Sequence, residues 1–333
     1  MKISLGGLSW WLDCDDVVRP AVAKAFGKSE AGARDCEHEQ AGATVHVRMR
    51  MGDSQEIEHW TEFRSSHSMD MDSGILRFKV SDGRSARLSC VSLEIDAGEA
   101  LEWVWLADPS EILTRGGSLL LNAWMRRWNK DWFPVHGAVI GQNGRYVLIP
   151  GESGAGKSTL TASAFAAGSM PDANPHGAEA KGWKIIGDDF VWVRQIDDEW
   201  IAEGPYASLR LTAEAREMVG RVWPEWSPES HWTQRGDGKW VGFPPKGVAT
   251  RGKLHGVLGI VPSDSNADIH GQATASDLIP AFRTSMLLLN ASGAHASGYL
   301  SACRQLLEEL PLGRLHRSPR LDENLQAIAR WLD

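Results

Sequence analysis

The feature that most constrains this chain is a glycine-rich loop between an apolar segment and a helix-forming segment. Residues 146–149 read Tyr-Val-Leu-Ile and predict a strand. Pro150 follows, and because it cannot donate a ladder hydrogen bond it is expected to close that strand. The next residues match the pattern G-x-x-x-x-G-K-[ST] at every fixed position: Gly151, Gly156, Lys157 and Ser158.

This order of strand, loop and helix is the context that a phosphate-binding loop requires. Glycines let the backbone curl so that successive N–H groups point inward at an anion, and the helix dipole favours the same charge. Lys157 is expected to reach the β- and γ-phosphates, and the Ser158 hydroxyl to bind Mg²⁺. The predicted nucleotide-binding residues are Gly151, Ser153, Gly154, Ala155, Gly156, Lys157, Ser158 and Thr159. The sequence therefore predicts an ATP- or GTP-binding protein.

The helix after the loop is predicted to run from Lys157 to about Ala167, because this stretch is rich in Ala and Leu. Gly168 is placed as its left-handed C′ residue. Two further helices are predicted near the C-terminus, at about 296–309 and about 322–332, the second with Asp322 as its cap.

Composition narrows the class of protein. With 333 residues the chain can form two domains, and a net charge of −8 argues against nucleic-acid binding. No apolar run is long enough for a transmembrane helix, and the N-terminus meets acidic residues too early for a signal peptide. The four cysteines are scattered, which favours a reducing, cytoplasmic location over disulfides or a zinc site. We expect neither a nucleic-acid nor a membrane partner.

The chain divides by pattern into three parts. Residues 1–108 contain period-two segments separated by turn clusters and predict a small, mostly β domain. Residues 109–130 carry apolar residues at helical spacing and predict a helical connector. Residues 131–333 contain the phosphate loop and predict the nucleotide-binding domain.

One histidine and three basic residues outside the loop are further candidates for the site. Gln142-Asn-Gly-Arg is a hairpin signal, so His136 and the loop are expected on adjacent antiparallel strands. Alone, His136 could equally be a satisfied core histidine. The basic side chains Arg210, Lys246 and Arg251 could contact a transferred phosphate or could be ordinary surface charges.

A pair of carboxylates, Asp188 and Asp189, interrupts an apolar strand after the loop helix. Phosphoryl transfer to a hydroxyl needs a carboxylate at the cation and one that orients or deprotonates the acceptor. Adjacent strand residues point to opposite faces, so both can serve one site only at a strand end or a bulge. The alternative is that Gly187-Asp-Asp is simply a turn.

Taken together, these motifs resemble those of HPr kinase/phosphorylase and its kinase-only relatives, which include kinases that tailor lasso-peptide precursors. The resemblance covers about residues 131–262 and rests on Val135-His-Gly, the loop from Gly151 to Ser158, and Ile186-Gly-Asp-Asp. It implies an α/β fold: a phosphate-loop kinase domain of the HPr kinase and phosphoenolpyruvate carboxykinase type, with a mixed sheet. The unmatched domain 1–108 is then expected to select the substrate.

The resemblance also implies roles for individual residues. Asp188 matches the catalytic base for the acceptor serine, His136 the active-site histidine, and Lys157 the phosphate-binding lysine. Asp189 and Ser158 match positions near Mg²⁺, and Arg251 matches a basic loop that touches the nucleotide. The glycine-rich signature tied to phosphorylase activity is missing, since this region reads Ile-Ala-Glu-Gly-Pro-Tyr from Ile201. A kinase without dephosphorylation, and with a substrate other than HPr, is therefore expected.

The leading hypothesis is a Mg²⁺- and ATP-dependent kinase acting on a serine hydroxyl of a peptide or small protein. A lasso-peptide precursor is its sharpest version. A homo-oligomeric assembly of this kinase is left open. Two alternatives stay open: a small-molecule kinase acting, for instance, on free serine, and a regulatory module that binds nucleotide without phosphotransfer.

Overall fold

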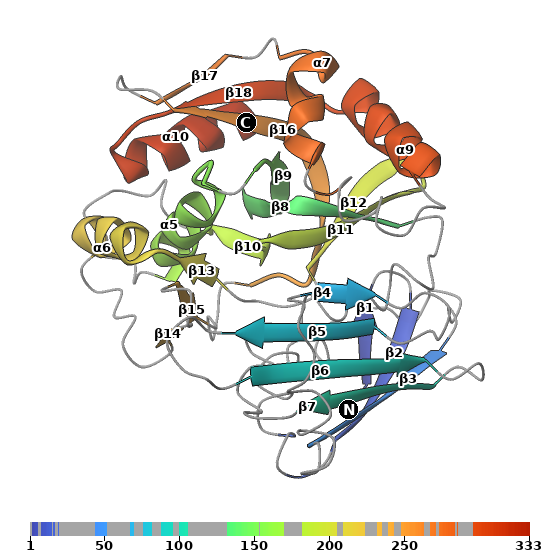
Figure 1. The fold of residues 1–333 in the computed structure, drawn as a ribbon. Coiled ribbons are helices and arrows are strands. Elements are labelled where there is room, and N and C mark those ends of the chain that lie inside the picture. Colours follow the sequence, from blue (N-terminus) through green and yellow to red (C-terminus); the bar gives the residue numbers. More distant parts are fainter. Residues whose placement is uncertain are drawn as a thin grey trace. The chain divides into compact units, whose positions relative to one another are not determined.

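The computed structural model shows a chain built from two compact units (Figure 1). It describes residues 2–5, 8–14, 16, 19, 44–51, 67–69, 76–81, 88–95, 100–105, 132–152, 154–169, 182–204, 209–223, 232–234, 239–242, 248–262, 267–270, 273–283, 285 and 296–333. The units are Met1–Leu119 with Gln234–Gly238, and Leu120–Thr233 with Lys239–Asp333. Within the described residues, no helix combines the length and apolar character that a membrane crossing requires.

The first unit contains a mixed sheet of seven described strands, in the order β1-β2-β3-β7-β6-β5-β4. The central pairs β2–β3 and β3–β7 are parallel, and the other pairs are antiparallel. The period-two segments of the sequence, at 44–50, 75–80, 86–91 and 101–106, overlap the strands β3, β5, β6 and β7. The strands are β1 Lys2–Leu5, β2 Leu8–Cys14, β3 Thr44–Met51, β4 His67–Met69, β5 Leu76–Ser81, β6 Leu88–Ile95 and β7 Ala100–Trp105. The predicted connector 109–130 lies outside the described residues.

The second unit is α/β, with a mixed eight-stranded sheet among its described residues, as the sequence predicted in outline. Its strands are β8 Phe133–Gln142, β9 Arg145–Pro150, β10 Lys184–Gly187, β11 Phe190–Ile196, β12 Glu199–Glu203, β16 Arg251–Pro262, β17 Asp268–His270 and β18 Leu312–Arg317. A smaller sheet contains β13 Leu209–Leu211, β15 Trp240–Gly242 and β14 Trp232–Gln234. The helices are α5 Lys157–Ser169, α6 Ala213–Val222, α7 Ala275–Leu278, α9 Ala296–Glu309 and α10 Leu321–Leu332, with a 3₁₀ turn, η3, at Ile279–Phe282.

Five strands of this sheet pair in a closed circuit: β8 with β9, β9 with β16, β16 with β12, β12 with β11, and β11 with β8. The circuit closes because β8 changes partner along its length. Its first half pairs with β11, and its second half pairs with β9 on one side and β10 on the other. The break between β10 and β11 therefore lies beside the middle of β8.

The hairpin before the loop has the predicted form. Asn143 and Gly144 join β8 to β9 with positive φ angles of 54° and 80°, as a two-residue turn of type I′ requires. Pro150 is the last residue of β9, as expected. His136 and the loop consequently lie on adjacent antiparallel strands, which confirms that part of the prediction.

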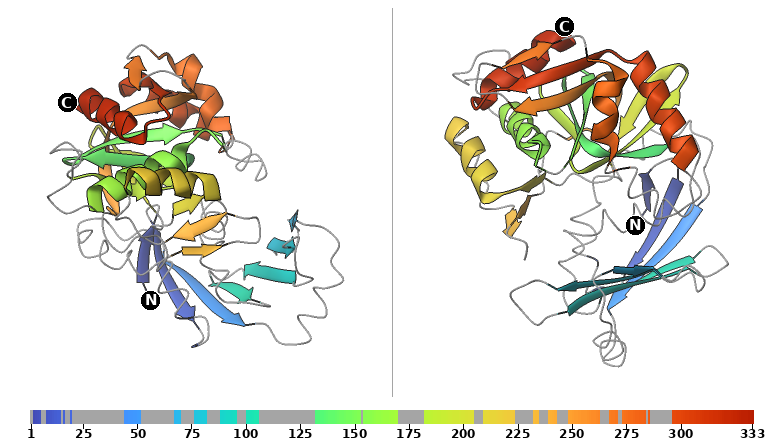
Figure 2. Two further views of the ribbon diagram at one scale, coloured as in Figure 1. Left: turned by 90° about the vertical axis from the view of Figure 1, so that its left-hand side faces the viewer. Right: turned by 45° about the horizontal axis from the view of Figure 1, so that its top comes forward.

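Helix α5 begins at Lys157 as predicted, and its residues from Thr159 to Ala167 are buried. Figures 1 and 2 show α5 with α6 and α10 on the same side of the sheet, and α5 packs against both. The core around α5 includes Phe165, Trp183 and Ile328. The hydroxyls of Thr161 and Ser163 are buried too, and each donates to a carbonyl one turn earlier. A helix buried this completely needs no polar face.

Two predicted helix ends are wrong. Gly168 lies inside α5, which continues to Ser169, and it does not have the positive φ of a C′ residue. Position 168 requires glycine for packing, because an added Cβ would overlap the Trp183 carbonyl oxygen. The cap of α10 is Arg320; Asp322 lies in the first turn, where its charge still favours the helix N-terminus.

Two helical glycines make a matched test of this packing. Gly168→Ala is expected to lower the free energy of unfolding by about 1–3 kcal/mol, because the methyl group meets backbone atoms that cannot rotate away. Gly220→Ala in α6 meets no atom within 4 Å and should instead stabilise by about 0.5–1 kcal/mol. Chemical denaturation of both variants measures the difference. Equal effects at the two positions would contradict the packing explanation.

Candidate active site

The phosphate loop joins the end of β9 to the start of α5, and its described residues are Gly151, Glu152 and those from Gly154 onward. Gly154 and Gly156 have positive φ angles of 89° and 95°, which turn successive amides toward one side. The predicted contact residue Ser153 lies outside the described residues. Ala155, Gly156 and Ser158 are partly exposed, whereas Thr159 is 8% exposed.

Lys157 is 6% exposed and folds back over the loop. Its Nζ donates to the carbonyls of Gly151 and Glu152, both at 2.8 Å. Burial lowers the pKa of this ammonium group, and the carboxylates of Asp188 and Asp189 oppose that shift. A buried cation inside a curled, glycine-rich backbone fits a polyphosphate, because the charge and the amides would meet the same anion.

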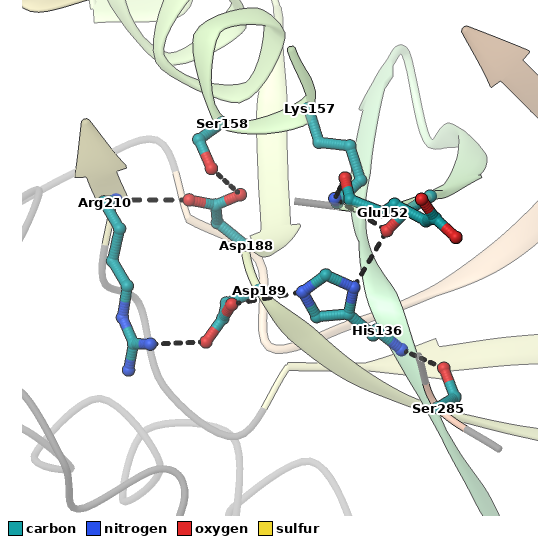
Figure 3. A network of polar contacts seen from close by, with 9 residues as sticks. His136, Glu152, Lys157, Ser158, Asp188, Asp189, Arg210 and Ser285 are labelled. Atoms are coloured by element: carbon teal, nitrogen blue, oxygen red, sulfur yellow. Dashed lines mark hydrogen bonds and ion pairs between the residues drawn. The ribbon is translucent and has the colours of Figure 1, made fainter. Parts of the chain in front are cut away.

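Asp188 and Asp189 occupy the break between β10 and β11. Asp189 has a φ of 80°, a left-handed conformation that interrupts strand alternation. The sequence predicted that both carboxylates could serve one site only if the strand were interrupted in this way. Figure 3 shows both side chains pointing into the space between the loop, β8 and β13. Asp188 is 1% exposed, whereas the Asp189 side chain is 21% exposed.

Asp188 connects the loop to β13. Its Oδ1 accepts from the Ser158 hydroxyl at 3.1 Å, and its Oδ2 accepts from the Arg210 amide at 3.2 Å. Burial, together with the charge of Asp189, raises the pKa of Asp188 to about 6. The two hydrogen bonds and Lys157 act in the opposite direction.

Asp189 faces two basic groups. The Arg210 guanidinium donates to its Oδ2 at 2.5 Å, and His136 Nε2 lies 3.5 Å from its Oδ1 (Figure 3). Burial alone would raise the pKa of Asp189, but Arg210, together with His136 and Lys157, lowers it to about 2. Two adjacent carboxylates are thus held with very different proton affinities.

His136 connects Asp189 to the phosphate loop. Its Nδ1 lies 2.8 Å from the Gly151 carbonyl oxygen, which also accepts from Lys157. Both ring nitrogens therefore face oxygen atoms. The His136 amide donates to the Ser285 hydroxyl at 2.6 Å. His136 is only 8% exposed, and its two ring nitrogens face the loop and Asp189.

The structure thus brings together the predicted residues His136, Lys157, Ser158, Asp188 and Asp189. The sequence allowed Arg210 to be either a phosphate contact or an ordinary surface charge. In the structure its side chain is 13% exposed and paired with Asp189. Arg251 is placed at the start of β16, with its guanidinium 5.9 Å from the centre of the Trp132 ring. The candidate Lys246 lies outside the described residues. Ser285 was not predicted, because nothing near it in sequence distinguishes it from other serines.

The oxygen donors beside the loop are of the kind that Mg²⁺ prefers. The Ser158 hydroxyl and the Asp188 carboxylate are neighbours, and Asp189 is held by Arg210 and His136. No group of three or more His, Cys, Asp or Glu residues that could hold a metal ion occurs in the described part of the chain. This donor set fits an ion held jointly with nucleotide phosphates, since such sites use only one or two protein ligands.

Among known proteins, similarity to this chain is found among solved structures. No protein-family model matches the sequence, and no curated protein matches it. Among solved structures, the chain is similar to the Hpr(Ser) kinase/phosphatase from Coxiella burnetii, at 12% identity and a TM-score of 0.29. That match covers 60% of this chain and 96% of the other.

The pKa of Asp188 leads to a test of the site that needs no substrate. A carboxyl group whose pKa rises on folding stabilises the folded state below its ordinary pKa, near 4, and loses that contribution as pH rises through 6. Between pH 4 and pH 7.5, the stability of the wild type should therefore fall by about 2–3 kcal/mol relative to Asp188→Asn.

Urea denaturation at several pH values measures this difference, with Asp197→Asn as the control. Asp197 is an exposed turn residue, so its replacement should leave the pH dependence unchanged. If Asp188→Asn and the wild type lost stability in parallel over this range, Asp188 would not be the buried titrating group.

Proposed function

We propose that this protein is a kinase that uses Mg²⁺ and ATP to phosphorylate a serine hydroxyl on a peptide. The observation that carries the proposal is the contact between Ser158 of the phosphate loop and the buried carboxylate of Asp188, 3.1 Å apart. A loop that binds phosphates and a proton acceptor in one place are the two parts that phosphoryl transfer to a hydroxyl requires. The motif resemblance to HPr kinase and its kinase-only relatives supports the same fold and the choice of serine.

Asp188 is proposed as the base. With a pKa raised to about 6 it is ionised at neutral pH, yet it holds a proton far better than an ordinary aspartate. Asp189 is poorly suited to that role because its pKa is about 2 and both its oxygens face basic groups. We infer that Asp189 holds Arg210 and His136 in place. It would contact the metal through a water molecule.

Bound ATP and Mg²⁺ would supply the phosphoryl group and neutralise its charge. Lys157 and the loop amides are proposed to hold the β- and γ-phosphates, and Ser158 to bind the metal. Asp188 would then accept the proton of the serine hydroxyl as its oxygen bonds to the γ-phosphorus and ADP leaves, while Arg210 and His136 contact Asp189 beside it. Positioning and charge stabilisation provide the rate enhancement, so no covalent enzyme intermediate is needed.

The acceptor can be identified with γ-labelled ATP, Mg²⁺ and a pool of serine-containing peptides, free serine and HPr. Asp188→Asn is expected to reduce phosphotransfer by about 10²–10⁴-fold while nucleotide binding changes little, because only the proton acceptor is lost. Scintillation counting of each separated acceptor and calorimetry with ATP measure the two effects.

The acceptor that carries label decides between the candidates. Label on a peptide, absent with Asp188→Asn and present with Asp197→Asn, supports the proposal. Label on free serine alone would make the protein a small-molecule kinase. ATP binding without transfer to any acceptor would count against the kinase and favour a nucleotide-dependent regulatory module.

A second variant tests the metal role of Ser158. Ser158→Ala should weaken binding of Mg·ATP by about tenfold and binding of metal-free ATP much less, because a metal ligand is removed and the loop amides remain. Isothermal titration with Mg²⁺ and with EDTA separates the two. Thr161→Ala is a suitable control, since that hydroxyl bonds within the helix. Equal losses with and without Mg²⁺ would contradict the ligand assignment.

A further inference from the structure

Arg317 lies at the phosphate loop although it is far from it in sequence. Strands β9, β16 and β18 are parallel, so their carboxyl ends lie at the same edge of the sheet. The loop begins where β9 ends, and Arg317 is the last residue of β18, paired with Pro262. Carboxyl ends of parallel strands are where α/β proteins bind their ligands.

The Arg317 guanidinium fills the space directly above Gly156. A Cβ added to Gly156 would overlap the Arg317 Nη1 atom and would lie 3.0 Å from Cζ and 3.5 Å from Cδ. Gly156 is the glycine that precedes Lys157 in the motif, with a φ of 95°. The Arg317 guanidinium is therefore in van der Waals contact with the backbone that is proposed to cradle phosphates.

The backbone that carries Arg317 is fixed on both sides. Before it, β18 is hydrogen-bonded to β16. After it, the Ser318 amide donates to Asn324 Oδ1 at 2.8 Å, and Asn324 Nδ2 returns a bond to the Ser318 carbonyl at 2.9 Å. Asn324 is fully buried in α10, which packs against α5. The position of Arg317 over the loop is thus determined by the same core that holds the loop helix.

The charge of Arg317 is available to a ligand. In the part of the chain that the structure describes, no carboxylate pairs with it, whereas Arg210 is paired with Asp189 and Arg314 with Asp277. A guanidinium presents parallel N–H groups that match two phosphate oxygens, which suits it to this neighbour.

We propose that Arg317 is a phosphate ligand of the bound nucleotide and contacts the phosphates that remain in the nucleotide after transfer. The inference rests on the proposed function and adds a residue to it. Arg317 contacts the loop at Gly156. The two aspartates instead contact Ser158, Arg210 and His136, so Arg317 is assigned to the phosphates and not to the acceptor. Arg317 accordingly strengthens binding of ATP and ADP alike and is no part of the proton-transfer machinery.

The test measures affinity by calorimetry for ADP and for inorganic pyrophosphate. Arg317→Gln should raise the Kd of both by about tenfold, since a charged hydrogen bond is lost. Arg314→Gln is the matched control: it removes the same charge from the same strand, but from a side chain paired with Asp277. Its affinities should equal those of the wild type.

The outcomes separate this inference from the proposed function. Unchanged affinity in Arg317→Gln, with normal binding by the wild type, overturns the role of Arg317 and leaves the kinase proposal intact. A loss confined to ADP overturns the phosphate assignment, as does a fall in kcat at constant Kd. A wild type that binds neither probe overturns both proposals. If Arg317→Gln does not fold, Arg317→Lys keeps the charge without the planar fork, and a Kd equal to that of the wild type overturns the inference.

Discussion

The placement of two adjacent carboxylates, Asp188 buried and Asp189 mostly buried, is the constraint on which the site depends. Asp188 and Asp189 would repel each other and lose hydration, so a fold that buries them must surround them with donors. It does so unequally: Asp188 receives two hydrogen bonds, from Ser158 and the Arg210 amide, whereas Asp189 receives the Arg210 guanidinium and faces His136. This inequality separates their pKa values to about 6 and about 2. A pair of identical residues thereby acquires two different proton affinities.

The sheet topology explains how these donors come together. Strand β8 carries His136 at the point where its pairing changes from β11 to β9, and the Asp pair lies in the break between β10 and β11 beside it. The parallel strands β9, β16 and β18 deliver the loop and Arg317 to one edge. One closed circuit of strands therefore holds the phosphate loop, the carboxylates and the histidine. The free energy for this arrangement comes from the buried core, in which α5 is covered by α6 and α10.

Much of the second unit could be predicted because its signals are local. The turn at Asn143 and Gly144, the strand that ends at Pro150 and the start of α5 each depend on a few neighbouring residues, and all three are present. The predicted end of α5 was wrong for the opposite reason. Gly168 has the sequence context of a helix stop, but its lack of a side chain is used to admit the Trp183 backbone. Local propensity cannot reveal which surface a glycine faces.

The sequence by itself determined the phosphate loop, the histidine on the strand beside it and the need for an irregular backbone at the two aspartates, because motif spacing and strand alternation follow from covalent geometry. Only the tertiary structure decided which groups neutralise those aspartates and which cations reach the loop. In the sequence Arg210 is one of three basic candidates, and Ser285 and Arg317 are not distinguished from other polar residues. They acquire roles through contacts between strands and helices far apart along the chain, and the energies that select such contacts depend on burial. Burial is a property of the folded molecule.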